Sequence, residues 1–205
     1  MRAFISVDIG ALPGIVKVLD DLKNTDADLK LVESENVHLT LKFLGEIDEK
    51  MVDEIAGVME ESVREVSPFR IKLRGVGVFP SMNYMRVVWI GLKDAEKLGV
   101  IAEQLENGLT AFGFKKEKRR FSPHVTIGRV KSSGKTFGFS KDARNSSWNS
   151  VASTRNKGVL QNFLNENKEK DFGELDVKSI RLKKSVLTSK GPEYSTVKEA
   201  PFQKY

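Results

Sequence analysis

Cysteine is absent from this 205-residue chain, and histidine occurs only twice. The absence of cysteine excludes disulfide scaffolds, thiol nucleophiles and thiolate metal sites, and it fits a protein of the reducing cytoplasm. Two histidines are too few for a three-histidine metal site. No apolar run approaches 18 residues, so the sequence predicts no membrane span. The first residues predict a strand and lack the long apolar stretch of a secretion signal.

The charge balance favours basic residues, with 34 Lys and Arg against 28 Asp and Glu and a net charge of +6. A positive balance favours polyanionic partners such as nucleic acid. Hydrophobic residues make up 40% of the chain and charged residues 30%, which is typical of a folded globular protein. A chain of this length can bury a core without disulfides or a metal. We therefore expect one domain over residues 1–205.

Strands and helices are mixed along the chain without the regular alternation of a parallel sheet, which predicts an α+β fold with antiparallel pairing. Apolar alternation predicts strands at Ala3–Ile9, Val37–Leu44, Phe69–Phe79, Met85–Leu92, His124–Val130, Val177–Leu187 and Tyr194–Val197. Helical spacing predicts helices at Leu12–Leu22, Asp48–Val66, Ala95–Phe112 and Val159–Leu164. Residues 132–153 are rich in Ser, Asn, Gly and Lys and predict a long polar loop or insertion.

Both histidines begin the same four-residue pattern of His, an apolar residue, Thr and a second apolar residue. The first copy is His38–Leu41 and the second is His124–Ile127. Alternate residues of a strand share a face, so each motif offers one imidazole and one hydroxyl on an open face. In the first copy, we expect Leu39, Leu41 and Phe43 on the opposite face, which packs against the core.

Two imidazoles and two hydroxyls on open faces suit phosphoester chemistry without a metal. One imidazole can take a proton from an attacking oxygen while the other protonates the leaving oxygen. An ordinary histidine pKa of about 6.5 lets both forms exist near neutrality. The hydroxyls of Thr40 and Thr126 can donate hydrogen bonds to phosphate oxygens. The pattern alone does not say which histidine is the acid and which the base.

Basic residues gather around the second motif and are candidates for contact with an RNA backbone: Lys115, Lys116, Lys118, Arg119, Arg120, Arg129, Lys131 and Lys135. Arg129 is the strongest of them, although simple alternation points it away from His124 unless a bend re-aims it. Lys42 shares the expected face of His38 and Thr40 and is a separate candidate for substrate binding. Candidates for stacking on a nucleobase, or for packing, are Phe79, Tyr84 and Trp148.

The sequence resembles the two-histidine phosphoesterases, specifically the RNA 2′,3′-cyclic phosphodiesterases first named 2′-5′ RNA ligases. The resemblance covers nearly the whole chain apart from residues 132–153. It rests on both His-x-Thr-x motifs in their extended forms and on shorter segments: Val37–Gly45, Ser122–Arg129, Arg2–Ile5, Val78–Pro80, Arg86–Trp89, Leu182–Ser185 and Gly191–Tyr194.

The resemblance implies a bilobal α+β fold with two antiparallel β-sheets, flanking helices and a pseudo-two-fold axis through a central cleft. It implies hydrolysis of 2′,3′-cyclic phosphate ends of RNA, such as tRNA fragments, to 2′-phosphates without a metal or cofactor. By analogy His38 is the proton donor and His124 the proton acceptor, while Thr40 and Thr126 hold the phosphate. The reverse reaction would join RNA ends through a 2′-5′ bond. We further expect a cytoplasmic monomer.

Two other interpretations stay open at this point. The chain could be a non-catalytic RNA-binding module that keeps the fold without the chemistry. Alternatively, it could be a phosphodiesterase that acts on 2′-5′ oligoadenylate or on an ADP-ribose cyclic phosphate.

Overall fold

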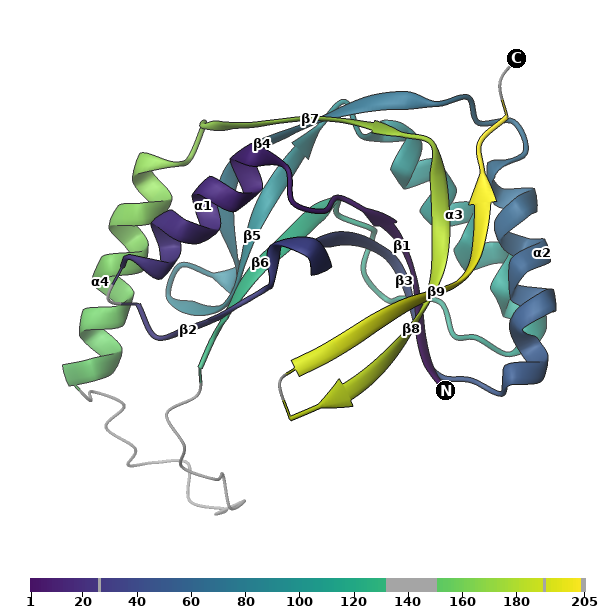
Figure 1. Cartoon of the computed structure of the whole chain (residues 1–205), viewed down its shortest axis with the longest axis horizontal. Helices are drawn as coiled ribbons and strands as arrows, with labels where there is room; N and C mark the ends of the chain where they lie inside the picture. The colour runs from purple at the N-terminus through teal and green to yellow at the C-terminus, as the bar shows by residue number, and fades with distance from the viewer. Residues whose placement is uncertain (26, 132–150, 190, 204–205) are drawn as a thin grey trace.

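Two antiparallel sheets form the framework of the computed structural model, which describes residues 1–25, 27–131, 151–189 and 191–203 (Figure 1). The first sheet has the strand order β3-β1-β8-β9. Its strands are β1 (Arg2–Asp8), β3 (His38–Glu46), β8 (Ser179–Thr188) and β9 (Gly191–Pro201). The second sheet has the order β2-β6-β5-β4-β7. Its strands are β2 (Leu29–Leu31), β4 (Phe69–Ser81), β5 (Tyr84–Lys93), β6 (His124–Val130) and β7 (Asp171–Val177).

Each sheet is flanked by its own pair of helices. The first sheet has α2 (Val52–Val63) and α3 (Glu96–Leu109) beside it, and the second has α1 (Pro13–Lys23) and α4 (Val151–Glu166) (Figure 1). Short 3₁₀ turns are η1 (Ser34–Asn36), η2 (Glu49–Met51) and η3 (Thr110–Phe112). The predicted α+β class, with two antiparallel sheets and flanking helices, is confirmed.

The strand orders of the two sheets correspond. Reading from the strand that holds each histidine, β3-β1-β8-β9 in the first sheet matches β6-β5-β4-β7 in the second, and β2 is added at the outer edge of β6. Every neighbouring pair is antiparallel in both sheets. The two motif strands therefore occupy equivalent places in the two lobes.

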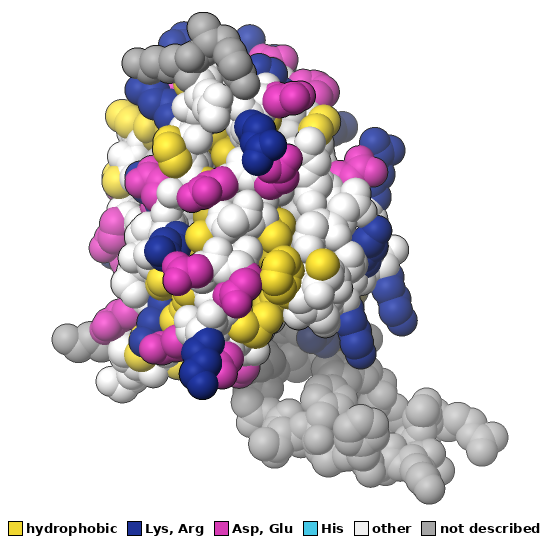
Figure 2. Space-filling model, turned by 90° about the vertical axis from the view of Figure 1, so that its right-hand side faces the viewer, with side chains coloured by type: hydrophobic (Ala, Val, Ile, Leu, Met, Phe, Trp, Pro, Cys, Tyr) yellow, Lys and Arg dark blue, Asp and Glu magenta, His cyan; other side chains and the backbone are white. Residues whose placement is uncertain are grey.

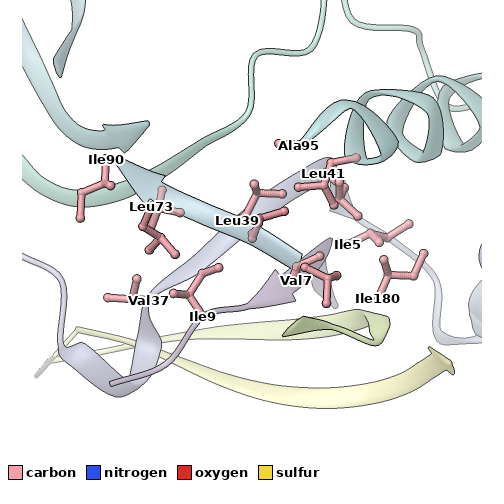
Figure 3. Close-up of a cluster of buried hydrophobic side chains, with 14 of the residues drawn as sticks. Ile5, Val7, Ile9, Val37, Leu39, Leu41, Leu73, Ile90, Ala95 and Ile180 are labelled. Atoms are coloured by element: carbon pink, nitrogen blue, oxygen red, sulfur yellow. The ribbon is translucent and has the colours of Figure 1, made fainter. Parts of the chain in front are cut away.

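One continuous hydrophobic core joins the two sheets. Leu39 and Leu41 of β3 and Ile5 of β1 meet Leu73 of β4 and Ile90 of β5 (Figure 3). These side chains alternate along their strands with residues on the opposite face, as a half-buried strand requires. Burial of one face thereby fixes which residues each strand turns away from the core, including both histidines.

The outer side of the first lobe carries α2 and α3, with a groove between them that includes Val58 and Phe112. Figure 2 looks onto this side and shows hydrophobic side chains among charged ones, with no histidine among the residues drawn in colour. No helix in the described ranges has the length and apolar character to span a bilayer.

The sequence pattern did not predict the strands β2 and β7, and it predicted the helix α4 too short. β2 was not predicted because three residues are too few to show an alternating pattern. In β7, charged residues and Gly173 interrupt the pattern, and its outer face is held by the ion pairs of Arg70 with Glu174 and Asp176. The predicted helix Val159–Leu164 is the C-terminal part of α4. Residues 151–153 of the predicted loop belong to α4, and residues 132–150 lie outside the described ranges.

Candidate functional site

The connection from β2 to β3 brings the two histidine motifs together. Leu31 of β2 pairs with Gly128 of β6, and the chain then passes through η1 into β3, which begins at His38. β3 and β6 also contact each other across the two sheets. The first motif is therefore tied to the strand that carries the second.

Each imidazole is held by the backbone in the same way. Nδ1 of His38 lies 2.7 Å from the carbonyl oxygen of Asn36, and Nδ1 of His124 lies 2.8 Å from that of Ser122. A carbonyl oxygen can only accept, so each Nδ1 donates and therefore carries a proton. In both rings Nε2 is then the nitrogen that can exchange a proton with a substrate.

Aromatic rings flank both imidazoles. The ring of His38 lies 4.8 Å from Phe4 and 5.2 Å from Tyr194, measured between centroids. The ring of His124 lies 4.9 Å from Phe79 and 6.5 Å from Trp89. These contacts restrict how each imidazole can turn. Phe79, a stacking candidate from the sequence, thus borders the site.

The indole of Trp89 depends on a glycine. A Cβ atom at Gly77, directly opposite on β4, would collide with the six-membered ring of that indole. Gly77 therefore leaves the space in which Trp89 lies beside His124. This explains one of the two glycines that interrupt the apolar alternation of β4.

A β-bulge follows the threonine in the first motif. Ser6 of β1 faces Thr40, but the next residue, Ile5, faces Lys42, so Leu41 is the extra residue. From that point the alternation is reversed. Phe43 consequently lies on the face of His38, with its side chain 61% exposed and its ring 6.3 Å from that of Phe4. The expectation that Phe43 faces the core is wrong.

The reversal also moves Lys42 to the opposite face. Its side chain is 3% exposed, and its ammonium group donates to Glu106 of α3 at 2.7 and 2.9 Å and to the carbonyl oxygen of Lys115 at 2.8 Å. The expectation that Lys42 shares the face of His38 and Thr40 is wrong, because the bulge lies between them. Lys42 instead ties β3 to α3.

The second motif contains a bulge at the equivalent place. Trp89 of β5 faces Thr126, but Val88 faces Gly128, so Ile127 is the extra residue. Arg129 is thereby turned to the face of His124, opposite Val87. Its positive charge acts on His38 and Tyr194 of the other sheet. Simple alternation would point Arg129 away from His124 unless a bend re-aimed it, and this bulge is that bend.

The two motif strands thus present equivalent sets of side chains. From β3 these are His38, Thr40 and Phe43, and from β6 they are His124, Thr126 and Arg129. Below, the faces that carry these residues are called the site faces. The site faces differ at the third position, where one strand has an aromatic ring and the other a guanidinium group.

The surroundings of His38 favour its neutral form. Burial lowers the pKa of His38 below its ordinary value of 6.5, and the charges of Lys183 and Arg129 act in the same direction. The hydrogen bond to Asn36 and the charge of Asp8 oppose them without cancelling them. The free protein therefore protonates this ring less readily than an exposed histidine.

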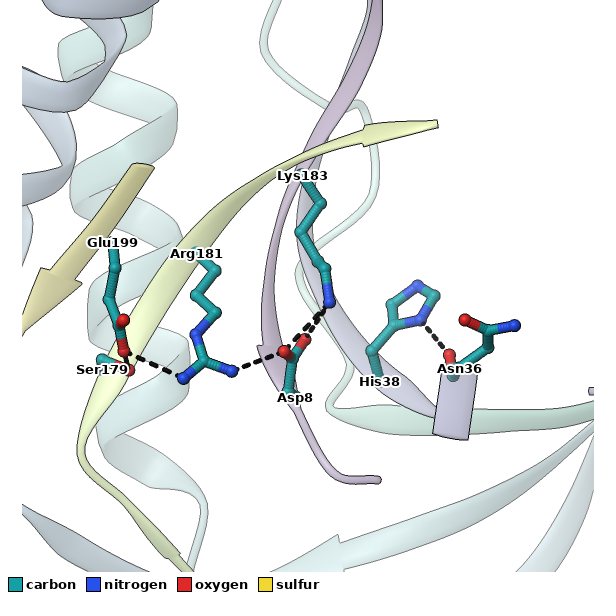
Figure 4. Close-up of polar contacts among 7 residues, drawn as sticks. All are labelled: Asp8, Asn36, His38, Ser179, Arg181, Lys183 and Glu199. Atoms are coloured by element: carbon teal, nitrogen blue, oxygen red, sulfur yellow. Dashed lines mark hydrogen bonds and ion pairs between the residues drawn. The ribbon is translucent and has the colours of Figure 1, made fainter. Parts of the chain in front are cut away.

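Asp8, Lys183 and Arg181 form a charged cluster on the site face of the first sheet (Figure 4). Burial alone would raise the pKa of Asp8, but hydrogen bonds and charges from Lys183 and Arg181 outweigh it and lower the pKa. Asp8 pairs with His38 across β1 and β3. Sequence reasoning missed this cluster because Asp8 is 173 residues from Arg181 and 175 residues from Lys183 along the chain.

Two buried side-chain polar atoms have no hydrogen-bond partner in the described part of the chain, namely the hydroxyl of Ser6 and the indole nitrogen of Trp89. Ser6 is directly opposite Thr40, and Trp89 is directly opposite Thr126. Unsatisfied buried groups are uncommon, and functional sites are one place where they occur.

The remaining candidates are dispersed. Lys116 donates to Asn107, and Tyr84 is exposed beside Arg86 in the hairpin of β4 and β5. Trp148 and Lys135 lie outside the described residues. Within the described ranges, no three His, Asp or Glu side chains are grouped so that they could hold a metal ion.

Comparison with known proteins identifies the family. A model of the 2′-5′ RNA ligase superfamily matches residues 13–141, which is more than half of the chain. The chain belongs to this superfamily. A Methanocaldococcus jannaschii relative named RNA 2′,3′-cyclic phosphodiesterase is 38% identical over 201 residues, covering 97% of this chain and 99% of the relative. A Methanothermobacter thermautotrophicus relative of the same name is 34% identical over 197 residues, covering 95% of each chain.

Solved structures show the same fold. A Thermus thermophilus protein superposes with a TM-score of 0.73 at 24% identity and covers 98% of both chains. Escherichia coli LigT, crystallised with 3′-AMP, has a TM-score of 0.69 at 19% identity and covers 99% of this chain and 98% of its own. The fold that this chain shares with these structures therefore extends across both lobes.

Proposed function

We propose that this chain hydrolyses the 2′,3′-cyclic phosphate at the end of an RNA strand to a 2′-phosphate, with two imidazoles and no metal ion. The observation that carries the proposal is the matched geometry of His38 and His124. Each ring donates from Nδ1 to the carbonyl two residues earlier, and each has a threonine on the same face. The names of the M. jannaschii and M. thermautotrophicus relatives support the activity.

The chemistry needs one proton donor and one proton acceptor. A water oxygen attacks phosphorus while the bond from phosphorus to the 3′ oxygen breaks. His124 accepts the proton that the water loses, and His38 donates a proton to the departing 3′ oxygen. The products are a 2′-phosphate and a 3′-hydroxyl. The geometry of the two rings is alike, so this assignment of roles follows the family resemblance.

The other residues of the site faces supply binding. The hydroxyls of Thr40 and Thr126 donate to phosphate oxygens, and Arg129 adds a guanidinium group that suits phosphate geometry. Phe43 offers an exposed ring on which a nucleobase can stack. A phosphate and a base joined by one ribose would then contact both strands.

The lowered pKa of His38 is compatible with a proton donor. Burial and the charges of Lys183 and Arg129 disfavour its protonation in the free protein. A bound phosphate carries negative charge, which favours the imidazolium form. Substrate binding would therefore raise the pKa of His38 and charge the ring when the proton is needed.

The same groups can join two RNA strands. The 5′-hydroxyl oxygen of a second strand attacks phosphorus in place of water and gives its proton to His124, while the bond from phosphorus to the 3′ oxygen breaks and that oxygen takes a proton from His38. The product is a 2′-5′ phosphodiester. We propose this ligation as a secondary activity. Incubation of an RNA with a 5′-hydroxyl and a second RNA with a cyclic phosphate end tests it, with nuclease mapping of the junction.

The decisive assay uses an oligonucleotide with a 2′,3′-cyclic phosphate end, incubated in EDTA and followed by ³¹P NMR. We expect a 2′-phosphate product, with the double variant His38→Ala, His124→Ala as the blank. Binding without any product would favour a non-catalytic RNA-binding module. Faster turnover of 2′-5′ oligoadenylate or an ADP-ribose cyclic phosphate would reassign the substrate.

A further inference from the structure

A row of ion pairs crosses the site face of the first sheet beside His38. The carboxylate of Asp8 accepts hydrogen bonds from Nζ of Lys183 at 2.8 and 3.0 Å and from Nη1 of Arg181 at 2.6 Å (Figure 4). Arg181 also donates to Glu199 at 3.1 Å. None of these four side chains transfers a proton or holds the phosphate in the proposed reaction.

Strand pairing places Lys183 and His38 on the same face. β1 lies between β3 and β8, with Asp8 opposite His38 and Phe4 opposite Lys183. The ring of Phe4 packs against the ring of His38. The side chain of Lys183 is 13% exposed, so water screens its charge only weakly.

We propose that Asp8 and Lys183 are positioning residues for His38: their ion pair holds an ammonium group beside the first imidazole, on the same face of the sheet. The ammonium group opposes protonation of His38 and the carboxylate favours it. The pair thereby sets how much of the ring is charged before substrate arrives. Its part in catalysis rests on the proposed function.

Charged and titratable groups reach His38 from every strand around it. Asp8 comes from β1, Lys183 from β8 and Arg129 from β6. Tyr194 of β9 touches the ring edge-on, and burial raises the pKa of its hydroxyl, so it stays neutral. Two cations thus act against one anion, and the position of the Lys183 ammonium group is fixed by Asp8.

Opposite shifts distinguish this electrostatic role from a structural one. Lys183→Met removes a positive charge and should raise the pKa of His38. Asp8→Asn removes a negative charge but keeps an oxygen that accepts from Nζ of Lys183, so it should lower the pKa of His38 further. If the ion pair served only to hold the sheet together, both variants would break it alike and would disturb His38 in the same direction.

The test is an NMR titration of the imidazole protons. The chain has two histidines, so two Hε1 signals are expected, and the His124→Ala variant assigns them. Lys183→Arg keeps the positive charge, so the titration midpoint of His38 should stay at its wild-type value. Lys184→Met is the matched control, because Lys184 is the next residue of β8, turned to the opposite face and paired with Glu49.

The result that overturns the proposal is an unchanged midpoint of His38 in Lys183→Met and Asp8→Asn, or midpoints that move in the same direction. A shift in Lys184→Met as large as that in Lys183→Met would also overturn it. The titration needs no substrate, so opposite shifts in a protein without hydrolytic activity would reject only the proposed function. Hydrolysis without opposite shifts would reject only the role of the pair.

Discussion

The two lobes hold their histidines with the same backbone geometry but surround them differently. In the first lobe, His38 lies among a tyrosine, a phenylalanine and the ion pair of Asp8 and Lys183. In the second lobe, His124 lies against the rings of Phe79 and Trp89. The shared part fixes which ring nitrogen is free. The different part includes the burial and the charges that lower the pKa of His38.

The largest effect should come from removing either imidazole. His38→Ala and His124→Ala should each lower kcat/KM on a cyclic-phosphate oligonucleotide by about 10²- to 10⁴-fold, because each removes one of two proton transfers. Both proteins should stay folded, as checked by thermal unfolding followed by circular dichroism. If one variant retained near wild-type kcat/KM, the two lobes would not share the chemistry.

A large loss of stability, without a matching loss of chemistry, should follow from Lys42→Met. This substitution leaves Glu106 without its buried partner, and we expect the free energy of unfolding to fall by about 3 kcal/mol in urea titrations. The control is Lys72→Met, an exposed lysine paired with Asp94, which should change stability by less than about 0.5 kcal/mol. A stable variant with severely reduced kcat/KM would place Lys42 at the site after all.

Substitutions of Phe43 and Arg129, the third residues of the two site faces, should separate base binding from phosphate binding. Phe43→Leu should raise KM for a cyclic-phosphate oligonucleotide about tenfold, because base stacking is worth about 1–3 kcal/mol. Arg129→Met should weaken binding and reduce its dependence on salt, since it removes a cation from the phosphate. Phe112→Leu on the outer face is the control. Equal KM values for Phe43→Leu and wild type would remove Phe43 from the site.

The smallest effect concerns pH and stability. Because the pKa of His38 is lowered in the folded state, the unfolded chain binds more protons, and the free energy of unfolding falls as pH drops through 6.5 toward that lowered pKa. His38→Gln should flatten this slope in urea titrations. Asp8 acts at lower pH: its stabilisation is present above 3.8 and is lost as pH falls through its lowered pKa. An unchanged slope in His38→Gln would contradict the account of His38.

Sequence reasoning predicted which residues share a face of a strand where local rules apply. Residues two apart on a strand share a face, so His38 with Thr40 and His124 with Thr126 follow from their spacing. Period-two alternation also found β6 at its observed bounds, His124–Val130. The rule failed one residue beyond each threonine, because a bulge depends on pairing with the neighbouring strand and leaves no clear mark in the sequence.

Long-range contacts account for what the sequence could not show. Simple alternation along β3 places Lys42 on the site face only because it does not include the bulge. The partner of Lys42, Glu106, is 64 residues away in the sequence. Asp8 and Lys183 come from opposite ends of the chain and meet only because β1 and β8 are neighbours in the sheet. Gly77 could be seen as a bend in β4, but its contact with Trp89 requires the register of β4 and β5.

The most direct test of the central claim is a crystal structure with a nucleoside 2′-phosphate bound. If both lobes act on one phosphorus atom, Nε2 of His38 and Nε2 of His124 will each lie within about 3.2 Å of an oxygen on that phosphorus or on the adjoining 3′ carbon. A phosphate contacted by only one of the two rings, with the other ring turned to a separate part of the surface, would contradict the account.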